Sequence, residues 1–182
     1  MDRNDITVLA IDDQPDNIIT LKALLGEAFP LARVLTATNG PTGIELAVTQ
    51  DPDVILLDIV MPAMDGFETC RHLKTDERTR DIPVIFLTAL RTDRENRVKA
   101  VDAGAEAFLS KPIDETELAA QIRAMSKIKA ANLHKRDEAR RLAALVGERT
   151  HELNESRTAA LSLLEDLRAE NGVRRRIEAA LR

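Results

Sequence analysis

The chain has 182 residues, of which 44% are hydrophobic and 31% are charged, as is typical of a globular domain joined to some solvated helix. Its formal net charge of −5 and its aromatic content of 2% argue against a surface that binds nucleic acid through phosphates or stacked bases. No apolar run has the length of a membrane span, the polar N-terminus does not resemble a signal peptide, and a single cysteine can form no internal disulfide, so we expect a cytoplasmic protein.

The first two-thirds of the chain alternates five short apolar runs with five amphipathic stretches. Apolar runs closed by turn residues indicate buried strands, and apolar residues at helical spacing indicate helices. Strands are predicted at 6–11, 34–38, 54–58, 84–88 and 107–111, and helices at about 16–27, 41–50, 65–75, 93–103 and from 114 onward. Cys70 lies in phase with Phe67 and Leu73 on the third helix, which predicts a core position rather than a reactive thiol. This alternation predicts a parallel sheet covered on both faces and joined by right-handed crossovers.

Four of the five predicted strands end in, or run directly into, a polar side chain. Asp12 and Asp13 follow the first strand, Asp58 ends the third, Thr88 ends the fourth and Lys111 ends the fifth. In a doubly wound sheet the carboxyl ends of the strands share one edge, and ligands bind just outside it. If strands one and three are neighbours, as in the flavodoxin-like order 2-1-3-4-5, the three aspartates meet at the switch point.

Three carboxylates in one cleft raise each other's pKa unless a cation lies among them. Mg²⁺ is a hard ion that takes one or two carboxylates and keeps water and phosphate oxygens as its other ligands. With Lys111 for a phosphate oxygen and the Thr88 hydroxyl for another, the set predicts phosphoryl transfer to Asp58. The alternative, solvated loop residues, suits single acids such as Asp51 and Asp53, which we interpret as turn and cap residues. It does not explain five groups at strand ends.

The same residues carry a resemblance to a known family. The motifs are Asp12-Asp13, Asp58 within LLDIVMPAMDG, Thr88-Ala89 and GAEAFLSKP. Together they are highly specific, and over about residues 6–125 the chain resembles the receiver domain of bacterial two-component response regulators. The resemblance implies a flavodoxin-like α/β fold and a phosphorylation-activated module. Its partner would be a cognate histidine kinase or a phosphotransfer protein.

The resemblance also implies a metal site and a modified residue. Asp58 would be the phosphorylated aspartate. Asp13 and Asp58, together with the backbone carbonyl of Val60, would ligate Mg²⁺, and Asp12 would hold one of the waters of the ion. We therefore expect phosphorylation to require Mg²⁺ as the cofactor.

A third set of roles concerns the response to phosphorylation. By resemblance, Lys111 would bind a phosphoryl oxygen, and its peptide bond to Pro112 would be cis. Thr88 would move toward the phosphoryl group, and Phe108 would be the aromatic switch that turns inward with it. Phe in place of Tyr at this position keeps the ring and loses the hydroxyl. Enzymatic activity would be confined to self-catalysed phosphoryl transfer and autodephosphorylation at Asp58.

Other functions compete with this interpretation. A metal-dependent phosphatase or phosphotransferase acting on an external substrate also uses an aspartate nucleophile at a strand end. Such enzymes usually carry a second Asp two residues after the nucleophile, whereas Asp58 is followed by Ile59 and Val60. A degenerate receiver that serves only for dimerisation would lack part of the site, but all five residues are present. The chain could also be the front part of a hybrid sensor kinase.

The composition after residue 112 predicts one long helix that leads away from the receiver. We divide the chain into a receiver domain at 1–128 and a helical coiled-coil linker at 129–182. Eight of twelve residues at two heptad positions are apolar, which predicts a parallel homodimer with Glu152 facing Arg157 of its partner. A lone amphipathic helix packed back on the receiver is the alternative. The two positions hold Leu142, Arg149, Ser156, Leu163, Glu170 and Ile177, and Val146, Leu153, Ala160, Leu167, Arg174 and Leu181.

The segment ERTHEL, at 148–153, contains a His-Glu pair such as histidine kinases use for phosphorylation. In those helices an Arg or Asn and a Pro normally follow the pair, whereas Leu153 and Asn154 follow His151-Glu152 here. The segment more closely resembles the signalling-helix linkers that carry RT-x-EL between a receiver and a downstream domain. The terminal RRRIEAALR resembles the lead-in to a sensory or catalytic domain, so we expect an output domain beyond this chain.

Overall fold

The computed structural model describes residues 6–88 and 94–180. Ala89 of the predicted motifs and Leu181 of the predicted seam lie outside this part. The strands are β1 (Thr7–Ile11), β2 (Arg33–Ala37), β3 (Val54–Asp58), β4 (Val84–Thr88) and β5 (Ala107–Ser110). The helices are α1 (Pro15–Ala28), α2 (Gly40–Gln50), α3 (Gly66–Thr75), α4 (Arg94–Asp102) and α5 (Glu115–Ala180).

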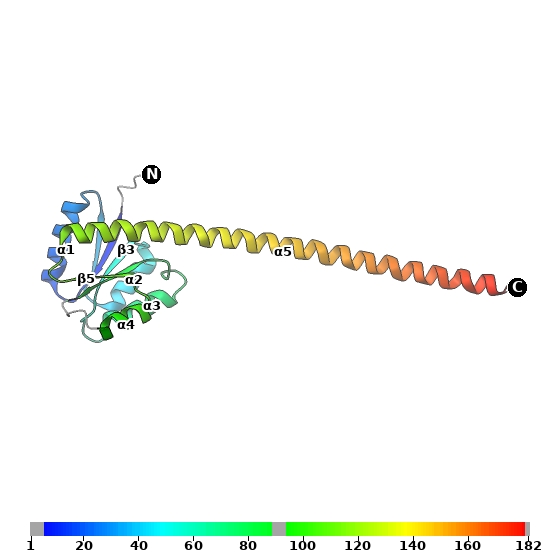
Figure 1. The fold of residues 1–182 in the computed structure, drawn as a ribbon, viewed down its shortest axis with the longest axis horizontal. Coiled ribbons are helices and arrows are strands. Elements are labelled where there is room, and N and C mark those ends of the chain that lie inside the picture. Colours follow the sequence, from blue (N-terminus) through cyan, green and yellow to red (C-terminus); the bar gives the residue numbers. More distant parts are fainter. Residues whose placement is uncertain (1–5, 89–93, 181–182) are drawn as a thin grey trace. The chain divides into compact units, whose positions relative to one another are not determined.

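All five strands form one parallel sheet in the order β2-β1-β3-β4-β5, which confirms the predicted topology (Figure 1). β3 and β4 are buried along their whole length, as continuous apolar runs in a parallel sheet require. Ile11 at the end of β1 pairs with Leu57 of β3. The residues that follow β1 therefore lie beside Asp58, which is the geometry on which the site depends.

The two faces of the sheet bury alternate residues of each strand. Side chains such as Leu9 and Leu57 pack with α2, α3 and α4, whereas Val8 and Leu56 pack with α1 and the first turns of α5. Full burial of each such side chain contributes about 1.5–3 kcal/mol. Cys70 of α3 is completely buried, and its thiol donates a hydrogen bond to the Ala103 carbonyl at 3.2 Å, which confirms its predicted core position.

Lys129 joins the first turns of α5 to the loop that precedes β3. Its side chain is 6% exposed, and its ammonium group donates to the Asp51 carboxylate and to the carbonyls of Asp51 and Pro52 at 2.8–2.9 Å. Asp51 ends α2 with a left-handed φ of 45°, and the Asp53 carboxylate accepts the Thr7 N–H at 2.8 Å. The interpretation of Asp51 as a cap residue is therefore correct, whereas the Asp53 carboxylate pairs with the first residue of β1, 46 positions away in sequence.

The chain divides into two compact units at His134. In the second unit α5 continues as a helix, and the apolar side chains at its predicted seam positions from Leu142 to Leu167 are exposed. Within the described residues no helix is both long and apolar enough to span a membrane. The coiled coil requires a second chain, so it stays a prediction, and so does the domain boundary at residue 128.

Candidate functional site

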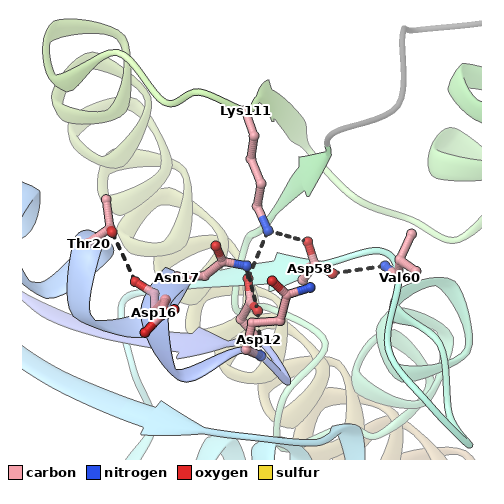
Figure 2. A network of polar contacts seen from close by, with 8 residues as sticks. Asp12, Asp16, Asn17, Thr20, Asp58, Val60 and Lys111 are labelled. Carbon is pink, nitrogen blue, oxygen red and sulfur yellow. Dashed lines mark hydrogen bonds and ion pairs between the residues drawn. The ribbon is translucent and has the colours of Figure 1, made fainter.

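Asp58 is a buried carboxylate at the carboxyl end of β3. It is 6% exposed; its Oδ2 accepts the N–H of Val60 at 3.0 Å, and its Oδ1 accepts from the Lys111 ammonium at 2.6 Å (Figure 2). Burial raises the pKa of Asp58, the nearby Asp12 charge raises it further, and Lys111 and the Val60 N–H only partly counteract them. The ionised form of this carboxylate is therefore destabilised, and a further cation nearby would stabilise it.

Asp12 and Asp13 extend β1 toward Asp58 but have different surroundings. Asp12 is fully buried, and its two oxygens accept from the Gln14 N–H, the Asn17 amide and the Lys111 ammonium at 2.8–2.9 Å. Asp13 is half-buried, and its Oδ1 is buried without a hydrogen-bond partner among the described residues. Asp12 is therefore held in place by hydrogen-bond donors, whereas Asp13 has a buried oxygen that can still accept.

The three carboxylates are close enough to share an ion. One oxygen each from Asp12, Asp13 and Asp58 lies within 4.8 Å of the others. Oxygen donors of this kind suit Mg²⁺, which accepts one or two carboxylates and completes its octahedron with water. The unpartnered Oδ1 of Asp13 is the group that such an ion would satisfy, so the residues present fit the predicted metal.

Lys111 supplies the positive charge of the site from the turn that follows β5. β5 ends at Ser110 rather than at Lys111, a difference of one residue at a strand end. Burial lowers the pKa of Lys111, but the hydrogen bonds and charges of Asp12 and Asp58 outweigh it and raise the pKa overall. The peptide bond from Lys111 to Pro112 is cis, which confirms that prediction.

Thr88 and Phe108 lie on the neighbouring strands β4 and β5, Thr88 at the edge of the site and Phe108 two residues before the end of its strand. Thr88 is 5% exposed at the end of β4, pairs with Ser110 in register, and its carbonyl accepts the Lys111 N–H at 2.8 Å. Phe108 of β5 is half-buried beside Phe86 and packs against the core. The structure thus brings Thr88 to the edge that holds Lys111, while the switching roles of Thr88 and Phe108 stay predictions.

Two residues at the site were not found from the sequence. Asn17, on the first turn of α1, places its amide nitrogen 2.9 Å from both oxygens of Asp12. Gly66 begins α3 so close to β3 that a Cβ atom there would stand 2.2 Å from the Asp58 carbonyl oxygen. An amide five residues after Asp12 and a glycine after the turn of Pro62 were the available signals.

The arrangement of the site agrees with the comparison to known families. The sequence model of one protein family, the response regulator receiver domain, matches residues 8–123, a segment that contains every predicted site residue. The chain belongs to this family. Receiver domains are phosphoryl-accepting signalling domains, and a phosphatase acting on an external substrate is not favoured.

Individual relatives share the receiver and differ in what surrounds it. The response regulator PleD of Caulobacter vibrioides is 43% identical over 122 residues, 67% of this chain and 26% of PleD. Protein PilH of Pseudomonas aeruginosa is 39% identical over 118 residues, 65% of this chain and 95% of PilH. The chain thus spans about a quarter of PleD but nearly all of PilH.

A solved structure adds a receiver that contains a metal. It is the receiver domain of the sensor histidine kinase PA1611 from Pseudomonas aeruginosa, with a magnesium ion coordinated in its active-site cleft. It is 31% identical, with a TM-score of 0.59 over 67% of this chain and 98% of that one.

Proposed function

We propose that the chain receives a phosphoryl group on Asp58 from a histidine kinase or a phosphotransfer protein, in a reaction that requires Mg²⁺. The observation that carries the proposal is the Asp58 carboxylate, buried at a strand end, 2.6 Å from Lys111 and clustered with two further aspartates. Among the described residues, no other group of three acidic, histidine or cysteine side chains has metal-binding geometry.

The proposed chemistry uses the polar groups at this edge of the sheet. A carboxylate oxygen of Asp58 attacks the phosphorus of the donor, and the bond from phosphorus to the leaving group breaks as the new P–O bond forms. Lys111 shifts its ammonium from the carboxylate to a phosphoryl oxygen, and the Thr88 hydroxyl donates to another. Asp13, Asp58 and the Val60 carbonyl would hold Mg²⁺, which when bound would supply positive charge beside the crowded oxygens.

Mass spectrometry of the intact chain and its peptides tests this assignment. After incubation with a small phosphodonor and Mg²⁺, we expect one added phosphoryl group, located on the peptide that carries Asp58. The Asp58→Asn variant is expected to take up none, and addition of EDTA is expected to prevent labelling. Asp16→Asn removes an exposed carboxylate one turn from the site (Figure 2) and serves as the matched control. Undiminished labelling of Asp58→Asn would show that the acceptor is another residue.

A second part of the proposal is a parallel homodimer through α5. Its support is the row of exposed apolar residues at the predicted seam: Leu142, Val146, Leu153, Leu163 and Leu167 are 49–70% exposed. Five such side chains on one stripe of a helix are typical of a coiled-coil seam. Glu152 forms an ion pair with Arg149 of its own chain at 2.8 Å, which competes with the predicted pair to Arg157 of the partner.

Two glutamate substitutions separate the seam from the rest of the helix. Leu163 lies on the seam and Leu161 lies outside it, although both are exposed, at 62% and 52%. We expect Leu163→Glu to shift the chain from dimer toward monomer in light scattering, whereas Leu161→Glu keeps the dimer at the same concentration. If both variants and the wild type have the same mass in solution, α5 is not the dimerisation element.

A further inference from the structure

The carboxylate of Asp12 is the most completely coordinated acid of the site. Its Oδ1 accepts from the Gln14 N–H and from Asn17 Nδ2, both at 2.9 Å, and its Oδ2 accepts from Asn17 Nδ2 at 2.9 Å and from Lys111 Nζ at 2.8 Å. A carboxylate has about four lone-pair positions. In a side chain with no exposed surface, three donor groups of the chain itself make four contacts with its oxygens.

Asn17 makes two of these four contacts and is the only side-chain amide among the donors (Figure 2). Its nitrogen lies 2.9 Å from both carboxylate oxygens, so one N–H shared between them in a three-centre hydrogen bond can fix the rotation of the group. An amide does this without adding charge to a site that already holds three acids. An aspartate of the same size could donate nothing and would add a fourth negative charge.

The fixed carboxylate in turn directs the lysine. Lys111 Nζ lies between Asp12 Oδ2 at 2.8 Å and Asp58 Oδ1 at 2.6 Å. If Asp12 rotated, the ammonium would lose one of its two anchors beside Asp58. Meanwhile Asp13, which has an unpartnered buried Oδ1, is left as the acid free to meet a cation.

We propose that Asn17 is a positioning residue for the phosphoryl-transfer site. It clamps the Asp12 carboxylate so that Asp12 orients Lys111, and direct metal ligation falls to Asp13 and Asp58. The assignment rests on the proposed function for its role in phosphorylation, but its effect on Mg²⁺ binding and on the metal-free fold does not depend on any phosphodonor.

The test compares Asn17→Ala and Asn17→Asp with wild type. Asn17→Ala removes the clamp, and because loss of a residue that orients a metal-site carboxylate typically costs 10–100-fold in metal affinity, we expect Mg²⁺ binding to weaken about tenfold by calorimetric titration. Asn17→Asp keeps the shape but replaces the donor by a second acceptor, which repels the Asp12 carboxylate. We expect a lower melting temperature in EDTA and a larger gain on adding Mg²⁺ than in wild type.

Thr20→Ala is the matched control. Thr20 lies on the same helix and is exposed, and in the described structure its hydroxyl donates only to the Asp16 carbonyl. It should leave both measurements unchanged. A purely structural role for Asn17 would leave the Mg²⁺ affinity of Asn17→Ala and the Mg²⁺-dependent gain of Asn17→Asp equal to those of wild type, and would overturn the proposal. If wild type takes up no phosphoryl group, the proposed function fails while these two comparisons still decide the role of Asn17.

Discussion

Replacing Lys129 by Met is expected to lower the free energy of unfolding of the receiver. Met has a similar length and flexibility, so it fills the same space and removes only the ammonium group. That group donates three hydrogen bonds, to the carbonyls of Asp51 and Pro52 and to the Asp51 carboxylate. The substitution therefore measures the contribution of the buried ammonium group separately from the packing of the alkyl chain.

The three hydrogen bonds of Lys129 contribute different amounts to the free energy of unfolding. The Asp51 carboxylate is 67% exposed and regains water, so its pairing contributes at most about 1 kcal/mol. The Pro52 carbonyl belongs to a buried residue, and a buried acceptor left without a donor costs about 1–3 kcal/mol. Relief from burying a charge offsets part of this loss. We expect a net loss of about 2 kcal/mol, and Asp51→Asn, which keeps both carbonyls, should cost less than about 1 kcal/mol.

Differential scanning calorimetry in EDTA measures the effect, because the chain has no Trp or Tyr for fluorescence. For a domain of this size the loss corresponds to a melting temperature lower by about 8 °C. Lys127→Met, on the exposed side of the same turn, is the control and should change little. If Lys129→Met melts within about 1 °C of the control, the buried ammonium contributes no net stability and the reasoning is wrong.

Three other predictions follow from the site and the core. Asp58→Asn should be more stable than wild type at pH 7 without metal: the raised pKa means that ionisation above the ordinary value of 3.8 destabilises the fold. The advantage should shrink toward pH 3.8 in calorimetric scans, and an advantage that grows there would contradict this sign. Gly66→Ala should cost about 1–3 kcal/mol in chemical unfolding because its Cβ meets backbone, whereas Gly26→Ala, with nothing within 4 Å, should stabilise or be neutral. Burial raises the pKa of Cys70 to about 12, so alkylation by iodoacetamide at pH 8 should need denaturant; rapid labelling of the folded chain would argue against a buried thiol.

The helices and strands, and the polar residues at the strand ends, could be predicted from the sequence alone. β3 and β4 have the bounds that their apolar runs predict, because a continuous run closed by turn residues has few alternatives to a buried strand. The polar residues at the strand ends could be assigned to one edge because parallel strands all point the same way. The strand order does not follow from the pattern alone; the resemblance to receivers implies it, and the sheet pairing confirms it.

The contacts between these polar groups, and the residues that support them, become visible only in the folded chain. The Lys111 ammonium bridges Asp12 and Asp58 across 99 and 53 positions of sequence, and Lys129 reaches Asp51 across 78. In sequence Lys129 resembles any solvated helix lysine and Asn17 any first-turn amide, because their roles depend on what packs against them rather than on their neighbours in the chain. Contacts of this kind arise from the packing of whole elements, which local patterns do not encode.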